Sequence, residues 1–250
     1  MTGRYASVPD GSAPAIGNGS NPAAGACPTG LFDTALAGTR CRLDLGGVSA
    51  DRLRTRRWRA AAARSDRWLL DGCAGPTVDL GCGPGRLLTA LIERGVPALG
   101  VDTSALAVRM CTRRGAVALR RDVFDTLPGE GRWHHALLVD GNVGIGGNPV
   151  ALLRRTRLLI DPTGSVLVEL SGERGLWRGP ARVLGPDGAG AWFPWATVGA
   201  AAIGDVAGEA GLRLCRIHRR RRVFAELRPA GGSGSDLAAG RPANRNRPGH

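Results

Sequence analysis

The chain has 250 residues, of which 43% are hydrophobic and 22% charged, a composition that suits one globular domain with a well-filled core. No apolar run approaches the roughly 18 residues of a membrane span, and the polar N-terminus lacks the features of a secretory signal. The six cysteines are far apart and form no C-x-x-C pair, which argues against a zinc ribbon or a disulfide scaffold. We therefore expect reduced thiols in a cytoplasmic protein.

The net charge of +13 comes from arginine alone, because all 34 basic residues are arginines and the chain has no lysine. The abundant residue types, Gly, Ala, Pro and Arg, share GC-rich codons, so codon bias is the main explanation of the charge. Attraction to an anion such as nucleic acid is the alternative, and it stays open.

Composition divides the chain into four regions. Residues 1–30 and 229–250 are rich in Gly, Ala, Pro, Ser and Asn, and we expect both to be disordered tails. Residues 31–75 are expected to form an N-terminal helical cap, with a helix over 50–70 that carries an apolar stripe opposite its arginines. The main domain then spans residues 76–228.

From Thr77 onward, short apolar runs alternate with longer amphipathic segments. Strands are predicted at 77–80, 98–102, 116–120, 134–140, 165–170, 212–218 and 223–227, and helices at 86–95, 104–115, 148–160 and 196–211. This alternation predicts an α/β fold with a doubly wound, mostly parallel sheet of seven strands. The last two strands are separated only by Arg219–Arg222, interpreted as a solvated turn, so they should form a hairpin with one antiparallel strand.

A glycine motif, VDLGCGPGR at 78–86, lies where the first of these strands turns into a helix. Glycines there let a ligand approach the backbone closely, and the helix N-terminus favours an anionic group. The spacing is G-x-G-x-G, since Arg86 occupies the last position of the G-x-G-x-x-G found in dinucleotide binders. Asp79 precedes the first glycine by two residues, and it is either part of the site or a structural cap.

Acidic residues follow the next three strands as well. Asp102 ends the second strand, at a position where an acid can accept hydrogen bonds from a ribose diol. Asp122 and Val123 follow the third strand, and Asp140 ends the fourth. All of them fall at the carboxyl ends of strands, the edge at which open α/β sheets bind ligands.

Together these residues resemble the class I, Rossmann-like S-adenosylmethionine-dependent methyltransferases. The resemblance covers residues 77–170 and the final hairpin, and its most specific parts are VDLGCGPG at 78–85 and GVD at 100–102. It implies S-adenosylmethionine as the cofactor, with its methionine and ribose parts along Gly81, Gly83 and Gly85, its ribose on Asp102, its adenine on Asp122 and Val123, and its amino-acid end near Asp140.

The acceptor is expected to be a small molecule, by elimination. The tetrapeptide (D/N)PP(Y/F) of amino-methylating enzymes is absent after the fourth strand, where the chain has Asp-Gly-Asn-Val, and no cysteine follows a proline as in cytosine C5 enzymes. A set of metal ligands is not evident either. Two alternatives stay open: an arginine-rich nucleic-acid methyltransferase or binder, and a non-methylating protein on the same fold.

The acceptor side of the site is assigned to the long segment 171–195, expected to be a loop. Trp192 and Trp195 lie near its end and should shape the acceptor pocket, although a hydrophobic plug is the alternative. Asp140 is the best-placed candidate for a catalytic base, because its strand end faces the reactive part of the donor. The oligomeric state is left open.

Overall fold

The structure, a computed structural model, describes residues 30–46, 50–172 and 175–231. The two predicted tails lie outside the described residues, apart from Gly30 and residues 229–231. Pro229 is the last residue of the final strand, where it pairs with Leu212. The first residue of the predicted C-terminal tail thus belongs to the final strand.

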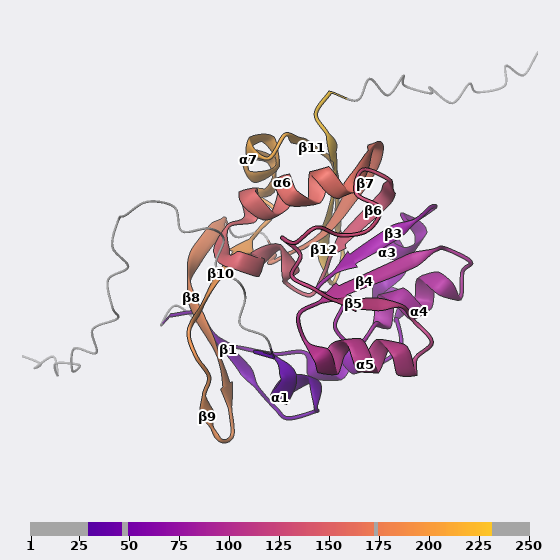
Figure 1. Cartoon of the computed structure of the whole chain (residues 1–250). Coiled ribbons are helices and arrows are strands. Elements are labelled where there is room, and N and C mark those ends of the chain that lie inside the picture. The colour runs from indigo at the N-terminus through magenta and orange to yellow at the C-terminus, as the bar shows by residue number, and fades with distance from the viewer. Residues whose placement is uncertain (1–29, 47–49, 173–174, 232–250) are drawn as a thin grey trace, which may run out of the picture.

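The core is the predicted seven-stranded sheet. Its strands are β3 (Thr77–Leu80), β4 (Ala98–Asp102), β5 (Ala118–Arg120), β6 (Trp133–Leu138), β7 (Ile160–Leu170), β11 (Leu212–Arg219) and β12 (Val223–Pro229). They lie in the order β11-β12-β7-β6-β3-β4-β5, and the pairs from β7 to β5 are parallel (Figure 1). β12 is antiparallel to both β7 and β11. The predicted fold class, including the antiparallel hairpin strand, is confirmed.

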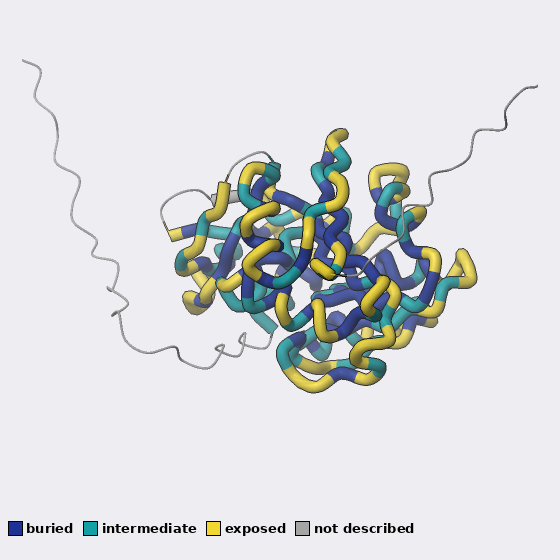
Figure 2. Tube along the Cα trace, turned by 90° about the horizontal axis from the view of Figure 1, so that it is seen from above, coloured by how far each residue is buried: buried dark blue, intermediate teal, exposed yellow. Residues whose placement is uncertain are grey.

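Helices cover both faces of this sheet. On one face, α6 (Pro149–Leu159) and α7 (Ile203–Glu209) bury Leu152, Leu153 and Ile203 against the strands. On the other face, α3 (Arg67–Asp71) and α4 (Arg86–Ile92) do the same with Leu69, Leu87 and Leu91. α5 (Ala105–Arg113) packs beside α4. Figure 2 shows the buried trace enclosed by exposed outer segments, as a doubly wound fold requires.

A second, antiparallel sheet replaces the loop that was predicted for 171–195. It is formed by β1 (Arg42–Asp44), β2 (Ala50–Arg52), β8 (Leu176–Gly185) and β10 (Phe193–Val198) in the order β10-β8-β1-β2, with β9 (Gly188–Ala189) paired to β8. The predicted helix over 196–211 was wrong at its start, because residues up to Val198 belong to β10. The strands were not predicted because proline in a sequence argues against a strand. In the structure, Pro180 and Pro194 lie opposite each other, so their missing N–H groups affect only one position of the ladder.

The N-terminal region is not the helical cap that the sequence suggested. It holds α1 (Asp33–Leu36), strands β1 and β2, α2 (Thr55–Arg59) and a short 3-10 turn, η1 (Arg64–Asp66), before α3. The single helix predicted over 50–70 was wrong, since β2 takes its start and Ala60 is extended, with φ −75° and ψ 170°. Pairing of β2 with β1 takes residues 50–52 out of the predicted helix.

The two sheets meet at η2 (Asn142–Gly147), a glycine-rich 3-10 segment that follows β6 and packs against β10. A Cβ atom on Gly144 would collide with the carbonyl oxygen of Ala196, so only glycine permits this approach. None of the helices in the described part of the chain is long and apolar enough to cross a lipid bilayer.

Candidate active site

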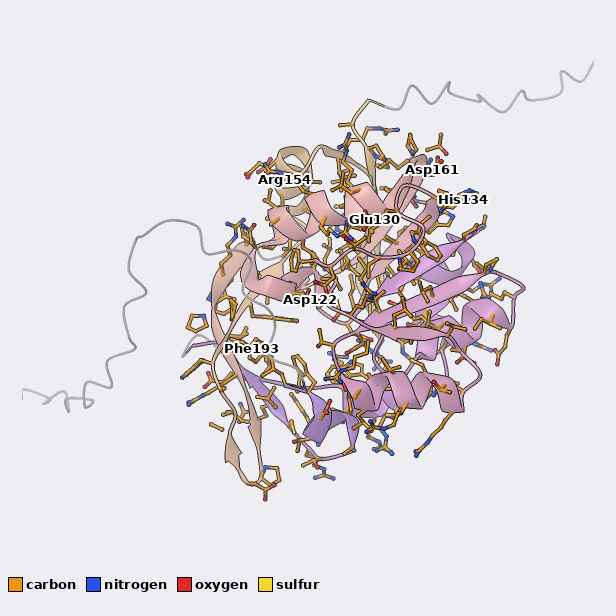
Figure 3. The ribbon with its side chains drawn as sticks, in the orientation of Figure 1. Asp122, Glu130, His134, Arg154, Asp161 and Phe193 are labelled. Carbon is orange, nitrogen blue, oxygen red and sulfur yellow. The ribbon has the colours of Figure 1, made fainter. Side chains whose placement is uncertain are left out.

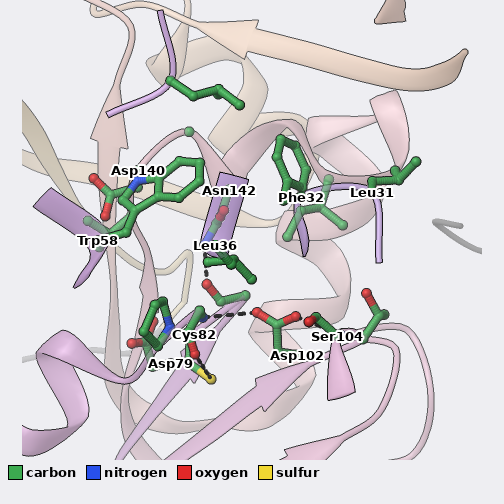
Figure 4. Close-up of a pocket in the computed structure, with 18 of the residues that line it drawn as sticks. Leu31, Phe32, Leu36, Trp58, Asp79, Cys82, Asp102, Ser104, Asp140 and Asn142 are labelled. Atoms are coloured by element: carbon green, nitrogen blue, oxygen red, sulfur yellow. Dashed lines mark hydrogen bonds between the residues drawn. The ribbon is translucent and has the colours of Figure 1, made fainter. Parts of the chain in front are cut away.

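A cavity of about 270 Å³ lies between the carboxyl edge of the large sheet and the second sheet. One wall is polar and comes from the ends of β3, β4, β5 and β6; the other is apolar and comes from the N-terminal region, η2 and β10. Figure 4 shows both, with Asp79, Cys82 and Asp102 in the lower part of the view and Phe32, Leu36 and Trp58 in the upper part. The cavity is therefore composed of two chemically distinct halves.

The glycine turn forms the floor of the polar half. Gly81 and Gly83 line the cavity with positive φ angles of 74° and 53°, and the Cβ position of Gly83 has no heavy atom within 4 Å. Asn142 Nδ2 donates to the carbonyl oxygens of Leu80 and Gly81 at 2.9 and 2.8 Å, which holds the turn in place. The backbone at Gly83 is thus open to a ligand.

Gly85 has a different role from the other two glycines. It does not line the cavity but begins α4 with φ 78°, and a Cβ atom there would lie 2.8 Å from Cys111 Sγ. Glycine at this position serves the packing of α4 against α5, and its predicted contact with the donor stays a prediction.

Asp102 connects β4 to the glycine turn. Its carboxylate accepts hydrogen bonds from the backbone N–H groups of Gly83 and Ser104, both at 2.9 Å. Burial raises the pKa of this carboxyl, although the two amides counteract the rise. Each oxygen keeps a second lone pair, and the residue lines the cavity, so it can also accept from a diol.

Asp122 and Val123 line the same cavity after β5, as predicted. Asp122 Oδ1 accepts from the backbone N–H of Phe124 at 3.0 Å, which fixes the turn, while the Val123 side chain is buried. The structure therefore brings four acids that lie at or just after the carboxyl ends of four different strands, Asp79, Asp102, Asp122 and Asp140, to one cavity.

Asp79 is almost fully buried in the cavity wall. Burial raises the pKa of its carboxyl to about 7, against the opposing charge of Arg86, and the negative charges of Asp140 and Asp102 add to the rise. A carboxyl in this setting pairs favourably with a cationic group of a ligand.

Asp140 lies in a network of buried ion pairs. It has φ 60°, and it pairs with Arg57, with Arg86 at 2.9 Å and with Arg222 at 3.5 Å. Its backbone N–H donates to Glu169 Oε2 at 2.6 Å. Because an arginine pairs with each of its carboxylate oxygens, Asp140 is better suited to neutralising these arginines than to accepting a proton.

The same network corrects the interpretation of Arg219–Arg222 as a solvated turn. The Arg222 side chain is only 6% exposed, and it pairs with Asp66 and with Glu169 at 2.6 Å. Its partners lie far away in the sequence, so nothing in the arginine run itself distinguishes this residue from its exposed neighbours.

Of the two residues predicted on the acceptor side, only one lines the cavity. Trp195 is buried in β10, in a hydrophobic cluster, and lines the cavity, so its role on the acceptor side stays a prediction. Trp192 is 45% exposed, lies outside the lining and stacks under the guanidinium of Arg182 at 4.3 Å. Sequence reasoning missed Phe32 and Trp58, which face the same apolar half from the N-terminal region. Their aromatic character was visible, but their proximity to the glycine turn depends on the second sheet.

Solved structures share this architecture. A S-adenosylmethionine-dependent methyltransferase from Bacteroides fragilis, in complex with S-adenosyl-L-homocysteine, is 21% identical over 80% of this chain and 92% of its own, with a TM-score of 0.65. The chain has the class I S-adenosylmethionine-dependent methyltransferase fold. DesVI from Streptomyces venezuelae has the same fold, with 16% identity over 71% of this chain and 94% of its own and a TM-score of 0.51.

A third solved structure with this fold is that of the 1,6-didemethyltoxoflavin-N1-methyltransferase from Burkholderia thailandensis. It is 18% identical over 66% of this chain and 77% of its own, with a TM-score of 0.51. The family model of the methionine biosynthesis protein MetW matches residues 60–131, which contain the glycine turn and Asp102. No curated protein sequence matches the chain. Within the described residues, no cluster of His, Cys, Asp or Glu could hold a metal ion.

Proposed function

We propose that the protein transfers a methyl group from S-adenosylmethionine to a small-molecule acceptor. The observation that carries this proposal is the two-part cavity, in which the glycine turn and the strand-end acids adjoin an apolar half. The complexes of similar structures support it, since the Burkholderia thailandensis enzyme was solved with 1,6-didemethyltoxoflavin and S-adenosylhomocysteine bound.

The residues present fit the donor. The open backbone at Gly83 leaves room for a ligand against the turn, and the carboxylate of Asp102 is already oriented for a ribose diol. Asp122 and Val123 would hold the adenine, and Asp79 offers a buried carboxyl to the cationic part of the methionyl group.

The donor supplies a methyl group that is already activated on a sulfonium sulfur. The bond from that carbon to sulfur breaks with its electrons going to sulfur, as a lone pair of the acceptor forms the new bond. The protein therefore contributes alignment and exclusion of water. We assign no general base, because Asp140 is engaged by arginines, and a proton on the acceptor atom leaves to solvent.

Calorimetry with S-adenosylhomocysteine tests the donor site. We expect the full chain to bind this product and not to bind NAD. Replacing Asp102 (Asp102→Ala) should weaken the affinity by about 1–3 kcal/mol, because donors on the ribose lose their partner.

The matched control is Asp161→Ala, since Asp161 lies near the start of β7, well away from Asp122 in Figure 3, and is outside the cavity. Its affinity should equal that of the unaltered chain. Binding of NAD without binding of S-adenosylhomocysteine would overturn the proposal.

A further inference from the structure

The apolar half of the cavity is an aromatic chamber, formed by Phe32, Trp58 and Trp195 together with aliphatic side chains. Phe32 is at its centre: its ring centroid lies 6.1 Å from that of Trp58 and 6.0 Å from that of Trp195, at interplanar angles of 83° and 56°. The aliphatic members are Leu31, Leu36, Leu43, Leu45, Leu53 and Ile145. Rings that meet at an angle offer both faces and edges to a flat guest.

Charge in the wall restricts that guest further. Arg86 is the one basic residue among the lining residues in the described part of the chain, and it is paired with Asp66 and Asp140. The protein wall therefore offers an anionic guest no free counter-charge, and the carboxylates of Asp79, Asp102 and Asp122 line the same cavity. A protonated amine has no lone pair to receive a methyl group, and it would be repelled by the sulfonium of the donor.

One polar atom of the chamber lacks a partner. The indole Nε1 of Trp58 is buried and makes no hydrogen bond to any described residue. A buried N–H without an acceptor is unfavourable, so an acceptor atom that a guest brings beside the indole would stabilise the complex. The guest should therefore carry an oxygen or nitrogen acceptor atom beside its ring.

From these three observations we infer that the methyl acceptor is a neutral, planar aromatic molecule that accepts a hydrogen bond from Trp58 Nε1. This inference rests on the proposed function and specifies its substrate class. Trp58 acts as a specificity-determining residue, because it selects a guest by its acceptor atom while Phe32 and Trp195 select it by shape.

The test uses three probes of similar size and different charge: 2-naphthol, 2-naphthoate and 1-methylquinolinium. Each is titrated calorimetrically into the full chain at pH 7.5, with and without saturating S-adenosylhomocysteine. We expect 2-naphthol to bind at least ten-fold more tightly than either ion. Equal or tighter binding of an ion would overturn the inference.

Two variants test the role of Trp58. Trp58→Phe keeps the ring and removes the N–H, and it should weaken 2-naphthol binding about five- to ten-fold. The control Trp192→Phe alters an exposed indole outside the cavity and should bind 2-naphthol as the unaltered chain does. An unchanged affinity for 2-naphthol in Trp58→Phe would contradict the assigned hydrogen bond. The comparison of the three probes uses the unaltered chain, so it tests the inference even if the variant fails to fold.

The two proposals fail separately. If S-adenosylhomocysteine binds and 2-naphthol does not, the aromatic chamber does not hold the acceptor and the donor site stands. If 2-naphthol binds with the expected selectivity and S-adenosylhomocysteine does not, the chamber stands and the proposed methyl transfer is wrong.

Discussion

Asp79 is a residue whose burial has a measurable thermodynamic consequence. Its pKa of about 7 lies well above the ordinary value of 3.8. Between these two values the folded protein keeps a proton that the unfolded chain has released. The free energy of unfolding therefore falls as pH rises from about 4 to about 7, and it levels off above that range.

Replacing this carboxyl by an amide (Asp79→Asn) should remove the loss of unfolding free energy that accompanies the rise in pH. The difference between about 7 and 3.8 corresponds to at most about 4 kcal/mol, which the variant should regain at pH 8 and not at pH 4. Denaturant unfolding at both pH values measures this. An equal gain at pH 4 and pH 8 would show that the ionised form carries no penalty.

The cavity positions of the four acids were predictable one by one, because each acid lies at or just after the end of a strand and these ends share an edge. Asp79, Asp102, Asp122 and Asp140 all reach the cavity for this reason. Trp58 was not predictable as a site residue, since its position depends on contacts of the N-terminal region with distant strands. Nor does the sequence indicate that Asp140 is surrounded by arginines.

At the scale of elements, the β11–β12 hairpin is fastened to the N-terminal region by Arg222. Burial opposes ionisation of Asp66, but the Ala63 amide and the guanidiniums of Arg86 and Arg222 lower its pKa overall. Asp66 is fully buried, so its charge depends on these partners. The hairpin thus forms one edge of the large sheet and also holds η1 in place through the pair of Arg222 with Asp66.

Removing this cation (Arg222→Met) should cost about 3–5 kcal/mol of stability, because Asp66 and Glu169 lose a buried partner. The neighbouring variant Arg221→Ala, at an exposed position in the same run, is the control and should change stability little. Chemical denaturation compares the two. Similar small losses in both variants would mean that the network contributes no net stability.

The contact between η2 and β10 joins the two sheets through Gly144. Adding one methyl group there (Gly144→Ala) would push η2 away from Ala196, and we expect a loss of about 1–3 kcal/mol. Gly208→Ala is the matched control, because the same atom meets nothing within 4 Å in α7 and should stabilise that helix by about 0.4–1 kcal/mol. Thermal unfolding of both variants tests the pair, and a stable Gly144→Ala variant would contradict the close contact.

The large sheet was predictable because its strands are continuous apolar runs between helices. The second sheet was not, since β8 and β10 contain prolines, β1 and β2 are only three residues long, and β1 pairs with the distant β8. Leu43 lies opposite Val183, a pairing that no local pattern indicates. In residues 50–70 the helical propensity was overridden only in part, because residues 50–52 pair with the nearby β1 while Thr55–Arg59 and Arg67–Asp71 remain helical.

For the whole molecule, the folded unit should extend slightly beyond residues 31–228. Gly30 O accepts from Asp33 N at 2.9 Å, and Ala230 N donates to Gly211 O at 3.0 Å. A chain trimmed to residues 30–231 should keep the melting temperature and the affinity for S-adenosylhomocysteine of the full chain, because the composition of the removed parts cannot offset the entropy of ordering.

A chain trimmed to residues 31–228 should melt at a lower temperature, since it loses both of these hydrogen bonds and the pairing of Pro229 with Leu212. Differential scanning calorimetry of the three lengths measures this. A large loss of stability in the 30–231 chain would show that one of the removed parts docks on the domain.

The pairing of β1 with β8 sets an order of assembly during synthesis. Asp44 and Arg182, which hold the two strands together at 2.9 Å, are 138 residues apart. Contacts of such separation form late, because a long chain segment must first be closed into a loop. A nascent chain that ends before Leu176 already contains the glycine turn and Asp102, whereas β1 and the aromatic rings near it still lack the strands that cover them. During synthesis, the residues of the polar half of the cavity are thus present first, and the apolar half can be completed only with the last third of the polypeptide.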